Sequence, residues 1–166
     1  MAVEYASSIR ASSAPHFRLH TNNRRSFKMI TLLTGKKGSG KTKKLIDLTH
    51  EAVLNSKGNV VCIEKGDTLT FDVDHNARLV NIEGYGISGY EGLYGFISGL
   101  CAGNYDITDI LVDSTLKIGS SDLSRLTPFL ARIRMLTDTA KVHITFSVSA
   151  DSTDLPEEVF KLAEIK

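Results

Sequence analysis

Eight consecutive residues, 35–42, are the part of the chain best suited to phosphate chemistry. Three glycines precede a Lys-Thr pair in the spacing G-x-x-x-x-G-K-[ST]. Glycines permit a tight turn whose main-chain N–H groups point toward one centre, and such a centre binds phosphate. We therefore expect a nucleotide-binding loop, called here the phosphate loop, made by Gly35, Lys36, Lys37, Gly38, Ser39, Gly40, Lys41 and Thr42.

The last two residues of the phosphate loop have specific expected roles. The Lys41 ammonium would reach the β- and γ-phosphate oxygens, as a binding and catalytic group. The Thr42 hydroxyl would take one coordination position on Mg²⁺. A helix that begins at Gly40 or Lys41 would direct the positive end of its dipole at the same anion.

The phosphate loop needs a strand before it and a helix after it. Residues 29–33, Met-Ile-Thr-Leu-Leu, form a short apolar run typical of a buried strand. Residues 45–53 repeat apolar side chains at spacings of three and four, which predicts a helix that ends near Lys57-Gly58. A glycine-rich turn that matches by chance is the alternative, and the agreement of strand, loop and helix argues against it.

Composition narrows the function classes. The chain has 166 residues and a formal net charge of +1, so a single domain is expected. Residues 29–166 are mildly acidic, which argues against general nucleic-acid binding. Apolar runs are too short to span a bilayer, and residues 1–28 contain no apolar core of a secretory signal. We expect a cytoplasmic protein without a membrane partner.

Residues 1–28 differ from the remainder of the chain. They are rich in Ser, Ala, His and Arg and show no apolar periodicity, so we expect a disordered extension before a nucleotide-binding domain at 29–166. The segment weakly resembles an organelle transit peptide; alternatively, it is an upstream extension and Met29 is the functional start. Cys62 and Cys101 have no metal-binding spacing, and we expect buried free thiols in a reducing compartment.

A second candidate for metal binding is Asp113. It ends the apolar strand expected within 106–114, and a carboxylate at that place would hold Mg²⁺ or its water opposite Thr42. The alternative is a strand-end Asp that caps a loop. The strand expected at 59–64 ends in Glu64.

The segments between these motifs allow several structures. Residues 68–76 predict an edge strand or a loop, and 77–82 predict a short strand. Seven glycines alternate with aromatic residues over 84–103, where a helical stripe begins at Tyr90. The glycine ridge in this helix indicates close packing on the sheet, or else a mobile segment whose tyrosines line a ligand or partner surface.

The C-terminal third predicts a helix, a strand and a last short helix. Ser121-Asp122 caps the helix, and Pro128 either kinks it or is its first residue after Thr127. The arginines of this helix are Arg125, Arg132 and Arg134. They form a solvated face, or one of them acts as an arginine finger in an oligomer. The strand is expected at 142–149, with Ser147 or Ser149 near the γ-phosphate and His143 as an ordinary strand residue. Residues 154–158 would begin the last helix.

This order of elements looks like a P-loop NTPase over residues 29–150, and most resembles the RecA-like group. The strand Ile110-Leu111-Val112-Asp113-Ser114 is similar to the Walker B strand of bacterial recombinases. The resemblance implies ATP with Mg²⁺ as ligands, and makes Glu64 the catalytic residue that polarises the attacking water. It also implies a three-layer α/β/α sandwich with a mostly parallel sheet of about five strands.

The chain also departs from that family. Ser114 follows Asp113 where many ATPases have glutamate, and the strand at 142–149 ends in serines where recombinases have glutamine. No N-K-x-D base-reading motif is present, which favours ATP over GTP. We expect slow Mg²⁺-dependent ATP hydrolysis that an unidentified protein partner or self-assembly could complete. The alternatives are a small-molecule kinase, with 84–94 as the acceptor pocket, and a nucleotide sensor without turnover.

Overall fold

The computed structural model describes residues 28–166. The predicted disordered extension therefore lies outside the described residues, except for Lys28. The Lys28 Nζ donates hydrogen bonds to the main-chain oxygens of Phe160 and Ala163. None of the described helices is long and apolar enough to cross a bilayer.

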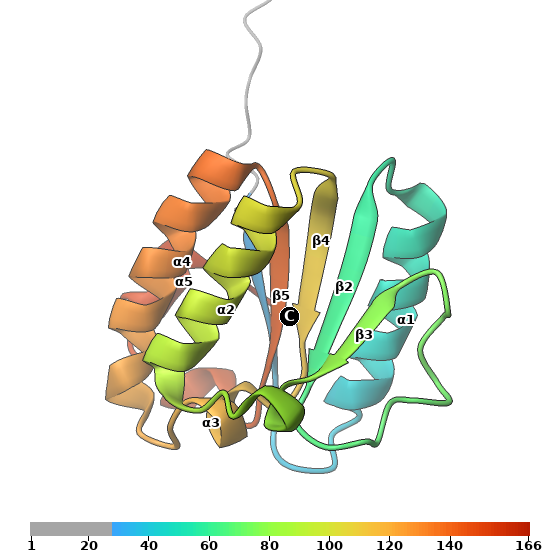
Figure 1. Ribbon diagram of the computed structural model, residues 1–166. Helices are drawn as coiled ribbons and strands as arrows, with labels where there is room; N and C mark the ends of the chain where they lie inside the picture. The colour runs from blue at the N-terminus through green and yellow to red at the C-terminus, as the bar shows by residue number, and fades with distance from the viewer. Residues whose placement is uncertain (1–27) are drawn as a thin grey trace, which may run out of the picture.

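A six-stranded, all-parallel sheet forms the centre of the molecule, in the order β3-β2-β4-β5-β1-β6 (Figure 1). The strands are β1 (Ile30–Thr34), β2 (Asn59–Glu64), β3 (Arg78–Asn81), β4 (Ile107–Val112), β5 (His143–Val148) and β6 (Glu164–Ile165). The predicted strand count was about five. The two-residue strand β6, which pairs with β1, is too short to produce a periodic signal in the sequence.

Helices cover both faces of the sheet, which confirms the predicted three-layer α/β/α fold. Figure 1 shows α2 and α4 in front of the strands and α1 behind them. The α-helices are α1 (Lys41–Asn55), α2 (Gly89–Gly103), α3 (Thr115–Ile118), α4 (Leu126–Ala140) and α5 (Val159–Leu162). The 3₁₀ helices are η1 (Ile82–Tyr85), η2 (Leu123–Arg125) and η3 (Ser152–Asp154).

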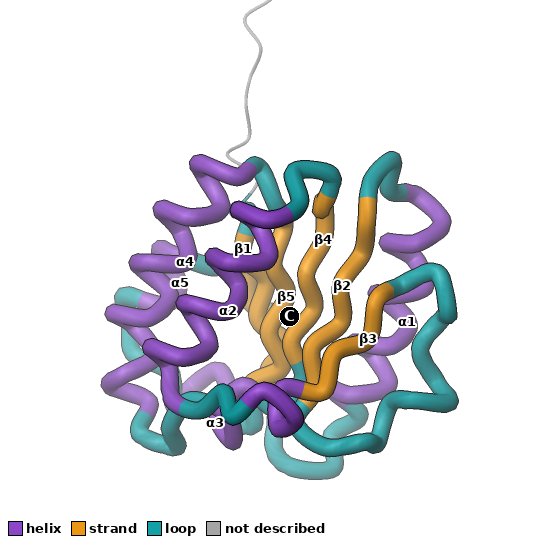
Figure 2. The backbone as a smooth tube through the Cα atoms, viewed as in Figure 1, coloured by secondary structure: helices purple, strands orange, loops and turns teal. Residues whose placement is uncertain are grey.

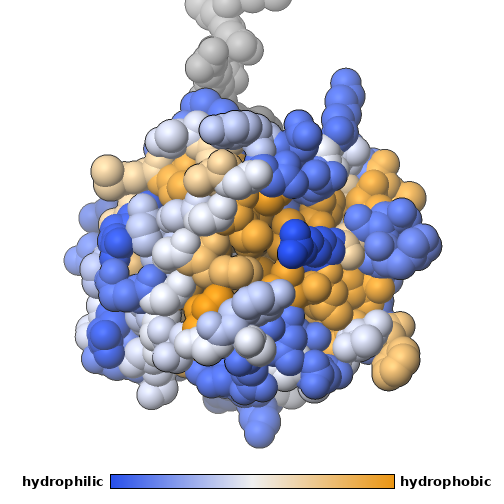
Figure 3. Space-filling model, in the orientation of Figure 1, coloured by the Kyte–Doolittle hydropathy of each residue, from blue (hydrophilic) through white to orange (hydrophobic). Residues whose placement is uncertain are grey.

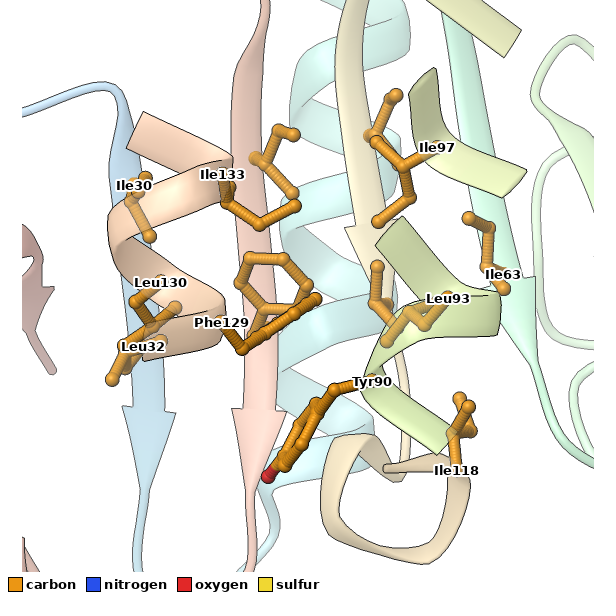
Figure 4. Close-up of a cluster of buried hydrophobic side chains, with 14 of the residues drawn as sticks. Ile30, Leu32, Ile63, Tyr90, Leu93, Ile97, Ile118, Phe129, Leu130 and Ile133 are labelled. Carbon is orange, nitrogen blue, oxygen red and sulfur yellow. The ribbon is translucent and has the colours of Figure 1, made fainter. Parts of the chain in front are cut away.

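Strand β2 shows why the sequence selects these layers. Val60 and Cys62 belong to the apolar cluster under α1, whereas Val61 and Ile63 belong to the larger cluster under α2 and α4. Side chains alternate between the two faces of a strand, so a strand covered on both sides needs a continuous apolar run. The larger cluster is seen in Figure 4, where Phe129 of α4 lies beside Tyr90 of α2. Their ring centroids are 4.7 Å apart.

Pro128 occupies a position that neither sequence alternative gave. Helix α4 begins at Leu126, so Pro128 is its third residue, and η2 precedes it with Asp122 accepting a hydrogen bond from the Ser124 N–H. The first turn of a helix has no intrahelical acceptor for its N–H groups. A proline at the third residue therefore removes no helical hydrogen bond and causes no break.

Residues 68–76 form a loop of turns between β2 and β3, so the alternative of an edge strand there was wrong (Figure 2). The helix predicted from Tyr90 is α2, but its glycine ridge does not serve close packing on the sheet. Gly95 and Gly99 are exposed, and a Cβ added at either would have no heavy-atom neighbour within 4 Å. Tyr90, Leu93 and Ile97 on the opposite side pack on the sheet.

The exposed glycines of α2 give a first prediction. Gly95→Ala and Gly99→Ala should each raise the free energy of unfolding by about 0.5–1 kcal/mol, because alanine loses less conformational freedom in a helix than glycine does. Neither glycine has a positive φ, so alanine causes no backbone strain. Urea unfolding followed by circular dichroism measures the change.

Gly119 provides the matched control. A Cβ there would lie 2.2 Å from a ring carbon of Tyr90, which is buried, so Gly119→Ala should lower the free energy of unfolding by about 1–3 kcal/mol. A lower free energy of unfolding for Gly95→Ala and Gly99→Ala would contradict the conclusion that both glycines of α2 face open space.

Candidate nucleotide-binding site

The phosphate loop connects β1 to α1, and none of its three glycines can be replaced without strain, because Gly35, Gly38 and Gly40 all have a positive φ. Gly35 has a φ of 137°, and a Cβ there would lie 2.5 Å from the Ser39 Oγ. Gly40 has a φ of 84° and is the residue before the first turn of α1. Gly40 makes no side-chain capping bond, and the first turn of α1 contains no acidic residue. The N–H groups and the positive end of the α1 dipole therefore remain available to an anion.

Lys41 lies inside the turn of the phosphate loop, and its side chain is only 9% exposed. Its Nζ donates to the main-chain oxygens of Gly35 and Lys36, both at 2.7 Å, and to the Ser39 Oγ at 3.3 Å. Desolvation lowers the pKa of Lys41, while the charges of Asp113 and Asp151 act in the opposite direction. These three bonds hold the ammonium inside the turn of the loop.

Asp113 follows β4 directly and is 6% exposed. Its Oδ1 accepts hydrogen bonds from the Thr42 hydroxyl at 3.3 Å and the Ser147 hydroxyl at 2.8 Å. Its Oδ2 accepts from the Ser114 hydroxyl at 2.8 Å. The structure therefore brings together Thr42 and Asp113, which are 71 positions apart in the sequence.

Thr42 and Asp113 present oxygen atoms of the kind that Mg²⁺ prefers. The Thr42 Oγ1 and the Asp113 Oδ1 lie side by side at 3.3 Å, and Mg²⁺ is commonly held by few protein oxygens together with waters and substrate phosphates. The pair therefore fits a magnesium ion that is shared with a polyphosphate.

The structure distinguishes between the two serines at the end of β5. Ser147 is buried, donates to Asp113 and accepts the Ser114 main-chain N–H at 2.8 Å. Ser149 is exposed. Ser114 adopts a φ of 55°, an uncommon conformation for a residue other than glycine, and its bonds to Asp113 and Ser147 hold it there.

A cavity of about 450 Å³ opens beside these groups. That volume is in the range of small-ligand sites. The wall opposite the phosphate loop belongs to α3, a single turn that sequence periodicity missed because it has only four residues. The lining residues are Lys37, Gly38, Gly40, Lys41, Thr42, Asp113, Ser114, Leu116, Lys117, Ser147 and Ser149. Lys36 is not among them, and its Nζ forms an ion pair with Asp151 at 3.4 Å.

Glu64 does not line this cavity. It is 1% exposed at the end of β2, and its Oε2 accepts from the Thr68 N–H at 2.9 Å, the Leu69 N–H at 3.0 Å and the Thr68 hydroxyl at 3.2 Å. It borders a separate cavity of about 370 Å³ next to the loop that follows β2. In this structure the Glu64 carboxylate anchors that loop. Sequence reasoning missed these contacts because two of the three donors are main-chain N–H groups, which residue types and spacing do not reveal.

The remaining candidates make contacts elsewhere. His143 begins β5, at the end of the sheet opposite the phosphate loop, where burial lowers its pKa and its Nε2 lies 3.1 Å from the Thr31 hydroxyl. On α4, Arg132 pairs with Glu91 and lies 3.9 Å above the Tyr94 ring. Arg134 pairs with Asp138 on the same helix. Neither arginine borders the cavity beside the phosphate loop.

The Asp113 network gives a prediction about stability. Ser147→Ala should lower the free energy of unfolding by about 1–3 kcal/mol, because the partly buried Ser114 N–H loses its acceptor and the buried Asp113 carboxylate loses a donor. Ser149→Ala is the matched control, and we expect a change within about 0.5 kcal/mol there. Chemical denaturation of the three proteins measures the difference, and equal stabilities would show that the network contributes nothing.

Comparisons with known proteins support the fold alone. No family model matches the sequence, and no curated protein matches it. Among solved structures, that of PCH-2 from C. elegans is similar, with a TM-score of 0.52 and 17% sequence identity. The match covers 88% of this chain, which spans 37% of the length of that structure. The two chains therefore share an α/β fold.

Proposed function

We propose that this protein binds ATP with Mg²⁺ in the cavity beside the phosphate loop and hydrolyses it slowly. One observation carries the proposal: Lys41, Thr42 and Asp113 converge on one cavity although they come from two separate motifs. Convergence of a buried ammonium, a hydroxyl and a carboxylate is the arrangement that a magnesium polyphosphate requires. The RecA-like subgroup remains part of the proposal, supported by the pair Asp113-Ser114 directly after β4.

Each group has a stated role in binding. The N–H groups of the phosphate loop and the first turn of α1 would hold the β-phosphate, and Lys41 would neutralise the β- and γ-phosphate oxygens. Thr42 and Asp113 would hold Mg²⁺, which would neutralise charge on the same phosphates. The positive φ angles at Gly35 and Gly40 keep the loop open to a large anion.

Slow turnover follows from the position of Glu64. In hydrolysis a water oxygen bonds to the γ-phosphorus, the bond to the bridging oxygen breaks, and the proton of the water passes to a base or to the phosphate. Asp113 is the one carboxylate in the described lining of the cavity, and it faces the metal site. Glu64 would have to leave the Thr68 and Leu69 N–H groups to polarise the water, and a protein partner or a second copy of the chain could favour that change.

A nucleotide sensor without turnover is the second candidate, and the same observation about Glu64 favours it. With its carboxylate retained by the loop after β2, the site could bind ATP and leave it intact. The kinase alternative has less support, because Tyr90 of the proposed acceptor segment is 6% exposed and packs in the core.

The first test of the proposed function is loss of binding. Lys41→Ala should weaken Mg-ATP binding about tenfold or more, because a charge-assisted hydrogen bond contributes about 1.5–3 kcal/mol. Calorimetric titration of Mg-ATP into both proteins measures the affinities. Lys161→Ala, an exposed lysine on α5, is the matched control and should bind as the wild type does. Failure of the wild type to bind Mg-ATP would refute the proposal.

The second test separates hydrolysis from sensing. Glu64→Gln keeps a carbonyl oxygen for the Thr68 and Leu69 N–H groups but removes the charge that would polarise water. If Glu64 acts in hydrolysis, the variant should release phosphate about 100-fold more slowly and bind Mg-ATP with unchanged affinity. A wild type without phosphate release above buffer would instead identify a sensor.

A further inference from the structure

The cavity beside the phosphate loop contains a basic residue that no motif assigns. Lys117 is exposed, borders the cavity, and belongs to α3, the turn that follows Asp113 and faces the phosphate loop. Figure 1 shows α3 at the carboxyl ends of the strands, on the same edge of the sheet as the phosphate loop. Lys117 is four residues after Asp113, so the lysine and the proposed metal ligand belong to one short segment of the chain.

We propose that Lys117 contacts the γ-phosphate from the wall opposite Lys41, and thereby makes the site selective for ATP over ADP. This inference rests on the proposed function. The β-phosphate would occupy the turn of the phosphate loop, around Lys41. A further phosphate would lie in the remainder of the cavity, whose lining includes Asp113, Ser147 and Lys117.

The turn that carries Lys117 is anchored at its start. The Ser114 N–H donates to the Ser147 Oγ, and the Ser114 hydroxyl donates to Asp113, so the beginning of α3 is tied to the metal-binding carboxylate. Thr115 and Ile118 are 0% and 2% exposed, so one side of the turn is packed against the protein and the other side borders the cavity.

The turn is also anchored at its end. The Lys65 Nζ donates to the main-chain oxygen of Lys117 at 3.1 Å, which connects α3 to the end of β2. The Tyr90 hydroxyl donates to the Ser120 oxygen at 3.2 Å, and the Tyr90 ring packs against Gly119. The backbone of Lys117 is therefore positioned before a ligand arrives, which lowers the entropic cost of using this lysine.

Charge balance agrees with a role at the third phosphate. The cavity lining holds three lysines, Lys37, Lys41 and Lys117, and one carboxylate, Asp113, which Mg²⁺ would neutralise. Mg-ATP carries one more negative charge than Mg-ADP. Arg132 and Arg134 of α4 pair with Glu91 and Asp138 and do not border the cavity, whereas Lys117 is the basic residue that α3 contributes to its lining.

The test compares two nucleotides on the full chain. Calorimetric titrations of Mg-ATP and Mg-ADP into the wild type, Lys117→Ala, Lys117→Arg and the Lys161→Ala control give eight affinities. We expect Lys117→Ala to weaken Mg-ATP binding about tenfold and Mg-ADP binding by less than about threefold, as for loss of one charge-assisted contact. Lys117→Arg should retain most of the preference for ATP, because it keeps the charge.

Each other outcome overturns the inference. Equal losses for Mg-ATP and Mg-ADP would show that Lys117 acts only through general positive potential, and unchanged affinities would show that it does not reach the ligand. A wild type that binds both nucleotides equally would remove the selectivity that Lys117 is proposed to supply. A wild type that binds neither nucleotide would refute the proposed function itself. If the wild type binds Mg-ATP and Lys41→Ala does not, the proposed function stands and the Lys117 variants test only the further inference. Circular dichroism of each variant confirms the native fold.

Discussion

One buried carboxylate connects the parts of the candidate site. Asp113 accepts hydrogen bonds from the first turn of α1, the end of β5 and the beginning of α3, through Thr42, Ser147 and Ser114. Burying a charge is costly unless it is hydrogen-bonded, and these three hydroxyl donors supply the necessary bonds. The same bonds fix the relative positions of the phosphate loop and α3, so the cavity between them depends on this single residue.

The strand order explains how the network is assembled. Strand β5 lies between β1 and β4, so the phosphate loop and Asp113 come from strands that are not neighbours. Ser147, at the end of β5, spans the gap between them. Because all six strands are parallel, their carboxyl ends meet at one edge of the sheet, where ligands bind in open α/β folds. On the face of the sheet that α2 and α4 partly cover, Figure 3 shows apolar residues between α2 and β3.

The sequence was informative where a short pattern determines both structure and chemistry. The strand before the glycine-rich segment and the helix after it were confirmed, because both have a clear apolar pattern in the sequence. Asp113 was predicted because a strand-end carboxylate has a defined place in a parallel sheet. In contrast, β6 and α3 have two and four residues, which is too short for a periodic pattern. The loop contacts of Glu64 and the direction of the α2 glycines depend on tertiary packing, which local spacing does not encode.

The open glycine face of α2 has a consequence for motion. Glycines leave the main-chain hydrogen bonds of a helix accessible to water, so α2 should exchange its amide hydrogens faster than α4, which has the same length. Tyr90 connects the first turn of α2 to the residues after α3. A transient opening of α2 would therefore loosen the α3 wall of the cavity beside the phosphate loop while the sheet stays intact, which would be a local route into and out of that cavity.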